Sequence, residues 1–314
     1  MGERRTRIPV LETFGPTVQG EGMVIGVKTC FVRTAGCDYS CSWCDSAFTW
    51  DGSAKADIRW LEPEDVLTEL KALSGGEWPG HVTLSGGNPA LLPQLGGLIA
   101  LLQGGGTIVA LETQGSRWQD WFPAVDELTL SPKPPSSGMA TDWARLDEIV
   151  ERLAAAGRTP SLKVVVMEEP FDGPQAAGSS GMASGAAGAG SAGESCGARS
   201  ADETSELKSA DEATRSRSRE GASRSTSADG TSEAARPGSD LAYAKEVHRR
   251  FPAVPMFLQA GNDRLDEPEP AALREHLAAR YERLVDAVMA DPDWRRVRVL
   301  PQLHAWLWGN KRGV

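Results

Sequence analysis

The sequence predicts an α/β fold, a partial, open (β/α)6 barrel that carries one long disordered insertion. Apolar, β-rich stretches alternate along the chain with stretches whose leucines recur at helical spacing, and this alternation is typical of parallel βαβ units. Six such units fit an open barrel better than a closed barrel of eight strands. The third observation is a run with almost no large apolar side chain, at residues 171–238.

The order of the elements follows from these patterns. We expect strands at residues 27–33, 81–87, 107–113, 127–133, 161–167 and 255–259, with a last short strand at 297–300. We expect helices at residues 62–74, 90–103, 142–155 and 241–250, and a long helix with Leu273, Leu277, Leu284 and Val288 on one face. The glycine-containing stretch 12–22 reads as an ordinary turn. Ligand sites in parallel sheets lie at the carboxyl ends of the strands, so the chemistry of this chain is expected there.

The low-complexity run divides the barrel into an N-terminal part, residues 1–170, and a C-terminal part, residues 239–314. Residues 171–238 are mostly Gly, Ala, Ser, Thr, Arg and Glu. Such a segment cannot bury enough apolar surface to offset its ordering entropy, so we expect a disordered insertion on a loop. A regulatory or partner-binding arm is the rival interpretation.

The charge balance bears on the partners of the protein. The chain of 314 residues has 33 Lys and Arg against 43 Asp and Glu, a formal net charge of −10. No net positive field exists to attract a nucleic-acid backbone, so nucleic acid is not expected as the main partner. The N-terminus has no apolar h-region and no apolar run approaches the roughly 18–20 residues of a membrane span. We expect no membrane association and a cytoplasmic location.

A cysteine loop carries the clearest chemistry. Cys37, Cys41 and Cys44 are spaced C-x3-C-x2-C, whereas Cys30 falls inside a predicted strand and is expected to pack as a small hydrophobic residue. A tetrahedral zinc would want a fourth protein ligand. A [4Fe-4S] cluster held by three cysteines leaves one iron open for a small ligand. A zinc knuckle, or plainly buried cysteines, are the alternatives to the cluster.

This spacing resembles that of the radical SAM superfamily. The resemblance implies that S-adenosylmethionine chelates the open iron, and that one electron then breaks its S–C5′ bond to release a 5′-deoxyadenosyl radical. Further motifs resemble the 7-carboxy-7-deazaguanine synthase family in order and spacing: VQGEG at 18–22, RTAGC at 33–37, CSWCDS at 41–46, SGGNP at 85–89, ETQG at 112–115, SPK at 131–133, LKVVV at 162–166 and PQLH at 301–304. The implied reaction converts 6-carboxy-5,6,7,8-tetrahydropterin to 7-carboxy-7-deazaguanine with loss of ammonia, in queuosine-type 7-deazapurine biosynthesis.

The resemblance also implies roles for individual residues. The cluster would be held by Cys37, Cys41 and Cys44, and Mg2+ by Ser46. S-adenosylmethionine would be held by Gly87, Ser131, Pro132, Lys133 and Gln259. The pterin would be bound by Val18, Gln19, Gly20, Arg33, Ser85, Gln302 and His304, with the planar guanidinium of Arg33 on the substrate carboxylate. Glu112 and His304 are the candidate catalytic residues. This chain has Asn88 where the superfamily usually has Glu, which leaves backbone binding through Gly87 intact.

Partners and alternatives complete the prediction. The resemblance implies a homodimer that takes electrons from a flavodoxin- or ferredoxin-type donor. One alternative is a radical SAM activase that makes a glycyl radical on a partner protein. It would share the cysteine spacing but would not require VQGEG, SPK or PQLH. The other alternative is a zinc-binding interaction module with a disordered arm.

Overall fold

The computed structural model describes residues 6–167 and 239–314 of the chain. These residues belong to one compact unit. The predicted insertion at 171–238 lies outside the described residues, so its boundaries with the flanking parts, 1–170 and 239–314, stay predictions. Among the residues that are described, no helix is both long and apolar enough to cross a membrane.

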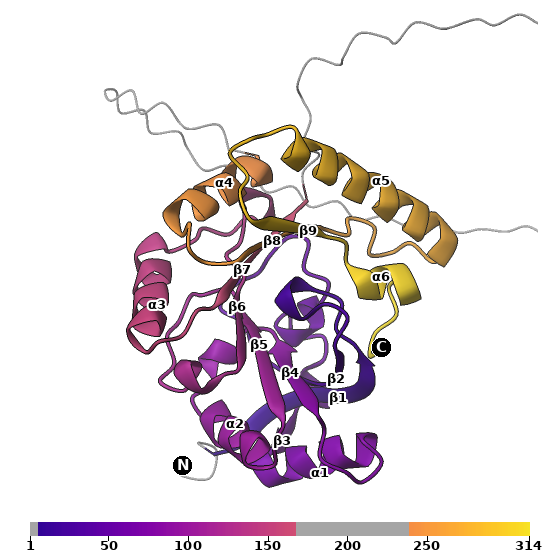
Figure 1. Cartoon of the computed structure of the whole chain (residues 1–314). Helices are drawn as coiled ribbons and strands as arrows, with labels where there is room; N and C mark the ends of the chain where they lie inside the picture. The colour runs from indigo at the N-terminus through magenta and orange to yellow at the C-terminus, as the bar shows by residue number, and fades with distance from the viewer. Residues whose placement is uncertain (1–5, 168–238) are drawn as a thin grey trace, which may run out of the picture. The chain divides into compact units, whose positions relative to one another are not determined.

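One sheet of nine strands forms the centre of this unit. Its strands run in the order β3-β1-β2-β4-β5-β6-β7-β8-β9. Their bounds are β1 Ile8–Val18, β2 Lys28–Thr34, β3 Arg59–Leu61, β4 His81–Gly86, β5 Ile108–Thr113, β6 Glu127–Leu130, β7 Ser161–Val166, β8 Met256–Ala260 and β9 Val297–Leu300. All neighbours from β2 to β9 are parallel, and β1 is antiparallel to both β2 and β3. The sheet curves without closing, which confirms the predicted open α/β barrel (Figure 1).

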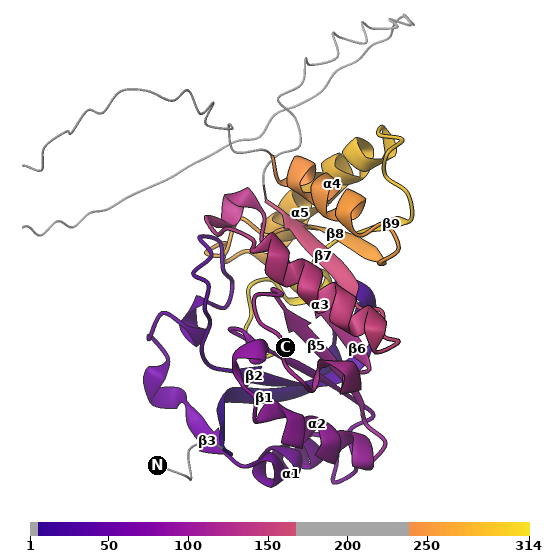
Figure 2. The same ribbon diagram turned by 90° about the vertical axis from the view of Figure 1, so that its left-hand side faces the viewer.

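Helices cover the outer side of this curved sheet (Figure 1). They are α1 Pro63–Leu73, α2 Leu95–Gly104, α3 Trp143–Ala155, α4 Asp240–Arg250 and α5 Pro270–Met289. The short α6 Leu303–Trp308 packs against α5 through Ala305. The start of α1 shows how the local sequence specifies the beginning of a helix. Glu62 and Asp65 form a reciprocal capping box there, and Pro63 occupies the first turn, where its missing N–H costs nothing. Figure 2 shows the same unit from the side, with α3 in front of the sheet.

The turn predicted for residues 12–22 is wrong over most of its length. Residues up to Val18 belong to β1, which pairs with β2 in the register Thr13 to Val32 and Phe14 to Phe31. Ile8 and Val10 are fully buried, so the strand gains hydrophobic burial that outweighs the turn propensity of its glycine and proline. Only residues 19–21 are irregular, and the short 3-10 helix Gly22–Val24 follows them.

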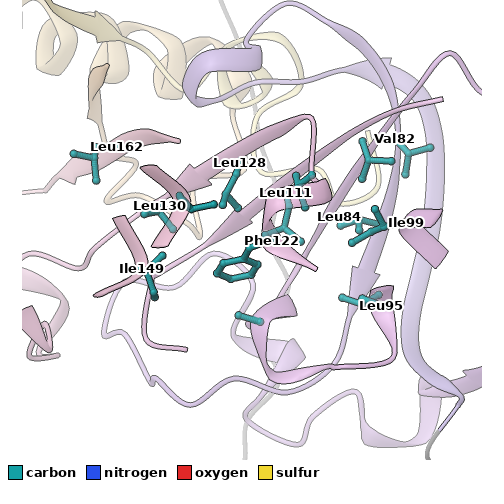
Figure 3. Packing of buried hydrophobic residues seen from close by; sticks show 14 of the residues in the cluster. Val82, Leu84, Leu95, Ile99, Leu111, Phe122, Leu128, Leu130, Ile149 and Leu162 are labelled. Carbon is teal, nitrogen blue, oxygen red and sulfur yellow. The ribbon is translucent and has the colours of Figure 1, made fainter. Parts of the chain in front are cut away.

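The main core lies between the sheet and the helices of its outer side. Figure 3 shows part of it, where side chains of β4, β5, β6 and β7 meet those of α2 and α3. The labelled residues are Val82, Leu84, Leu95, Ile99, Leu111, Phe122, Leu128, Leu130, Ile149 and Leu162. Burial on this side leaves the inner side of the sheet and the carboxyl ends of its strands to polar residues.

Candidate active site

The cysteine loop begins where β2 ends. The backbone N–H of Tyr39 donates to Cys37 Sγ at 3.4 Å, and the indole Nε1 of Trp50 donates to Cys44 Sγ at 3.4 Å. Burial raises the pKa of Cys41 to about 11, and the nearby Cys44 and Cys37 add to the rise while Lys133 opposes it. The three thiols therefore lie within electrostatic range of one another and have N–H donors beside them.

This donor set fits an iron–sulfur cluster held by three cysteines. Iron ligation removes the thiol protons, and N–H donors stabilise the sulfur charge that remains. Cys30 does not extend the set, because it is 2% exposed inside β2 and contacts Ser74 Oγ. Among residues 6–167 and 239–314, no fourth cysteine joins the loop.

The two glycines after β4 are required by close backbone approach. Gly86 has φ of +132°, and a Cβ added to it would lie 2.2 Å from the carbonyl oxygen of Thr34. A Cβ on Gly87 would lie 2.1 Å from the carbonyl oxygen of Gly36. Both are impossible contacts, so only glycine lets this turn pack on the cysteine loop. Gly87, a predicted S-adenosylmethionine contact, therefore borders the predicted cluster site.

The other predicted S-adenosylmethionine residues come from the ends of β6 and β8. Ser131 is 1% exposed, and Lys133 Nζ donates to its hydroxyl at 3.2 Å. Gln259 is fully buried, and its Nε2 donates to the carbonyl oxygen of Pro301 at 3.2 Å. Gln259 Oε1 has no hydrogen-bond partner within the described part of the chain. A buried acceptor without a partner is costly, so this atom fits contact with a donor group of a bound ligand.

A buried ion-pair cluster occupies the inner side of the sheet. Lys163, in β7, has a side chain only 2% exposed, and its ammonium contacts the carboxylates of Glu21 and Glu112. Burial lowers the pKa of Lys163, but the attraction of Glu112 and Glu21 outweighs it and raises that pKa. Burial raises the pKa of Glu21, but Lys163 and His304 overcome it and lower that pKa to about 2. Lys163 and Glu21 are therefore both ionised at neutral pH.

The segment after β9 meets the turn after β1 at this cluster. Gln302 Nε2 donates to Glu21 Oε1 at 2.8 Å, and Gln302 Oε1 accepts from the backbone N–H of Asn262 at 2.8 Å. A Cβ on Gly20 would lie 2.4 Å from His304 Nδ1. The structure thus brings Gly20, Gln302 and His304 together, with Val18 and the buried Gln19 directly before Gly20.

Arg33 and Ser85 lie side by side in the parallel register of β2 and β4. The guanidinium of Arg33 pairs with Glu12 and lies over the rings of Phe14 and Phe48. Burial lowers the pKa of Arg33, and the Glu12 carboxylate opposes that change. In this structure the predicted partner of the substrate carboxylate is therefore engaged by a carboxylate of the chain itself.

Ser46 lies at the far end of the cysteine loop. Its hydroxyl donates to Asp45 Oδ1 at 3.0 Å. Asp45 in turn has a carboxylate oxygen within 4.8 Å of ligand atoms of Glu21 and His304. Oxygen ligands of this kind suit Mg2+, and the group links the predicted metal residue to the buried ion pair.

Sequence reasoning missed three residues of this region. Lys163 is a lysine inside the strand SLKVVV, which is otherwise mostly apolar. A charged residue at a position expected to be buried breaks the apolar pattern, and this break could have marked Lys163 as a functional residue. Glu21 lies within VQGEG, but nothing in the sequence pairs it with Lys163. Asp38 follows the first cysteine of the loop, and its partners come from turns that are distant in the sequence.

Comparison with known proteins agrees with the geometry. Residues 31–167 match the model of the Radical SAM superfamily. The chain is similar to the 7-carboxy-7-deazaguanine synthase of Bacillus subtilis, with 46% identity over 309 residues that cover 98% of each chain. It is similar to the enzyme of that name from Bacillus cereus, with 44% identity over 98% of this chain and 100% of the relative. The alignment of this chain with the crystal structure of QueE from Escherichia coli covers 95% of each chain, with 18% sequence identity and a TM-score of 0.48.

Proposed function

We infer the function from one premise: this chain belongs to the 7-carboxy-7-deazaguanine synthase family of the radical SAM superfamily. It converts 6-carboxy-5,6,7,8-tetrahydropterin to 7-carboxy-7-deazaguanine with loss of ammonia. The observation that carries this conclusion is the meeting of distant motifs beside the cysteine loop, where Glu21 contacts both Lys163 and Gln302. The activase alternative is not supported, because the relatives that match along the whole chain are synthases.

The cofactor side of the site would be built from four strand ends. Radical SAM membership implies a [4Fe-4S] cluster and S-adenosylmethionine, which when bound supply a 5′-deoxyadenosyl radical to the substrate. Cys37, Cys41 and Cys44 would hold the cluster. S-adenosylmethionine would be held by Gly87, Ser131, Pro132, Lys133 and Gln259. The unpartnered Gln259 Oε1 supports this assignment, because a ligand donor would satisfy it.

The substrate side would be built from the turn after β1 and the segment after β9. The backbone of Val18, Gln19 and Gly20 would line the pterin, and Gln302 and His304 would close over it. Ser85 and Arg33 would reach its carboxylate, with Arg33 exchanging Glu12 for the substrate. Glu112 would be the catalytic carboxylate beside the reacting ring, where it accepts hydrogen bonds from the substrate, and Lys163 keeps that carboxylate in place. Lys163 is 1% exposed, so little water reaches its ammonium group.

A magnesium ion belongs to the same proposal. Ser46 would be one ligand, and the neighbouring Asp45, Glu21 and His304 support a cation at this place because their ligand atoms lie within 4.8 Å of one another. Mg2+ keeps several water or substrate oxygens among its ligands. The substrate carboxylate would complete its coordination.

Partners follow from the chemistry and the family. A radical SAM enzyme consumes an electron to start each cleavage, so we expect a flavodoxin- or ferredoxin-type donor. A homodimer and a cytoplasmic location are further parts of this proposal, and the free thiols of the cysteine loop suit a reducing compartment.

One anaerobic assay tests the function. The reconstituted protein is mixed with 6-carboxy-5,6,7,8-tetrahydropterin, S-adenosylmethionine, Mg2+ and a chemical reductant. We expect 7-carboxy-7-deazaguanine and ammonia in equal amounts. Cleavage of S-adenosylmethionine without any deazaguanine product would contradict the proposed substrate while leaving radical SAM chemistry intact. The Cys41→Ala variant is the control, since it should bind no complete cluster.

A further inference from the structure

The residue after the first cysteine of the loop accepts hydrogen bonds from two turns that are distant in the sequence. Asp38 Oδ1 accepts from Asn88 Nδ2 at 2.8 Å and from Gln114 Nε2 at 2.6 Å. Asp38 Oδ2 accepts from Ser116 Oγ at 2.8 Å. Asn88 follows β4, and the other two donors follow β5. One carboxylate therefore ties the cysteine loop to the carboxyl ends of two neighbouring strands.

Asn88 is the central member of this network. It is fully buried. Its Oδ1 accepts from Thr113 Oγ1 at 2.7 Å and from the backbone N–H of Ala90 at 3.2 Å, while Nδ2 donates to Asp38 and Ser116. Every hydrogen-bonding group of the amide is thus used inside the protein. The side chain of Asn88 therefore fixes the turn after β4, and its amide group is held in the orientation that donates to Asp38.

The network also reaches a predicted cluster ligand, Cys37. The amide Nε2 of Gln114 that donates to Asp38 lies 3.6 Å from Cys37 Sγ. The Asp38 side chain is only 21% exposed, so water competes little with these donors. Hydrogen bonds to a charged acceptor are stronger than those between neutral groups.

We propose that Asp38 is the positioning residue of the cysteine loop, and that its bonds to Asn88, Gln114 and Ser116 hold Cys37 in place for the cluster. The inference rests on the proposed function only in taking Cys37 as a cluster ligand. It assigns Asp38 no contact with substrate or with S-adenosylmethionine. The consequence is that loss of these bonds weakens the hold of the loop on iron.

Iron release measures this role without any turnover. The reconstituted variants are mixed anaerobically with an iron chelator, and the rate of iron loss is followed by absorbance. We expect Asp38→Ala to lose iron at least about tenfold faster than the unaltered chain, since the hydrogen bonds from Asn88, Gln114 and Ser116 to a charged acceptor disappear. The matched control is Asp51→Ala, because Asp51 is exposed shortly after the cysteine loop and accepts from Ser53 of its own turn. It should release iron at the unaltered rate.

A second comparison distinguishes a positioning role of Asp38 from a general contribution to the stability of the fold. Ile149→Ala in α3 removes core packing and should lower the melting temperature without speeding iron release. If Asp38→Ala releases iron no faster than a core variant of equal melting temperature, the proposal is overturned. If Asp38→Ala does not fold, Ser116→Ala removes a single donor to Asp38 and should speed release severalfold. An unchanged rate in that variant overturns the proposal equally.

An isosteric exchange tests the pair directly. Asn88→Asp places two carboxylates against each other and should speed iron release. Adding Asp38→Asn restores one donor and one acceptor across the same contact, so the double variant should release iron more slowly than Asn88→Asp alone. If the double variant releases iron as fast as Asn88→Asp alone, the contact between residues 38 and 88 is not the cause of the faster release, and the proposal is overturned. An unaltered chain that holds iron firmly but forms no deazaguanine would contradict the proposed function and leave this inference standing.

Discussion

Removal of the Lys163 ammonium should destabilise the protein more than any other single lysine change in its described part. Lys163→Met keeps an unbranched side chain of nearly the same length and removes the ammonium with its charge and its N–H donors. Glu21 and Glu112 then face each other without the cation that both contact. Neither carboxylate can turn freely to solvent, since their side chains are only 17% and 26% exposed.

The magnitude follows from the burial of the pair. Breaking a buried ion pair by removing one partner costs about 3–5 kcal/mol, because the remaining charge is left uncompensated. For a folded unit of this size, each kcal/mol lowers the melting temperature by about 2–4 °C. The expected loss is therefore about 10 °C, and the rate of pterin turnover should fall with it because Glu112 is no longer held in place.

Differential scanning calorimetry of the metal-free protein at pH 7 measures the loss. Lys245→Met is the matched control, because Lys245 pairs with Asp291 and Asp293 at the surface, where ion pairs contribute little. Adding Glu112→Gln to Lys163→Met removes one of the two opposed charges and should recover part of the stability. The reasoning fails if Lys163→Met melts within a degree or two of Lys245→Met.

Three further predictions follow from other parts of the chain. Ser46→Ala should blunt the stimulation of turnover by Mg2+ while Ser46→Thr preserves it, and an unchanged response removes Ser46 from the metal site. Replacing residues 171–238 by a short Gly/Ser linker should leave activity and melting temperature nearly intact, because the Met167 N–H donates to Asp240 Oδ2 at 2.8 Å across the junction and loop length costs little. A dead or unfolded product would contradict this. Burial raises the pKa of Tyr243, so the unfolded chain loses that proton first and the free energy of unfolding should fall as pH rises above about 10. Tyr243→Phe should flatten this fall between pH 9 and pH 11, and melting curves over that range decide it.

The strands of the parallel sheet could be predicted because each is a short apolar run that ends in polar or turn residues. His81–Gly86 and Ser161–Val166 lie within a residue of the expected ranges. The first strand, Ile8–Val18, could not be predicted in this way. Its glycine and proline favour a turn. The segment is a strand because it pairs with β2 and buries its apolar face, and neither contact can be read from the sequence.

The partners within the site could not be predicted, because they depend on which motifs meet in space. Glu21 and Lys163 are 142 positions apart in the sequence, and Glu21 and Gln302 are 281 positions apart. The sequence places all three residues in plausible motifs but says nothing of their contact. Arg33 shows the same limit, since its partner Glu12 comes from the strand that the sequence did not predict.

The charges of the site lead to one further consequence for the metal. Lys163 carries one positive charge against the two carboxylates of Glu21 and Glu112, so the buried group has one negative charge in excess. Asp45 brings a second carboxylate close to Glu21. Like charges at short range in a poorly solvated site repel strongly, and a cation bound there would relieve the repulsion. The charges that Lys163 is expected to hold together therefore also favour Mg2+ beside Ser46. The Mg2+ response of turnover should depend on Glu21 as well as on Ser46.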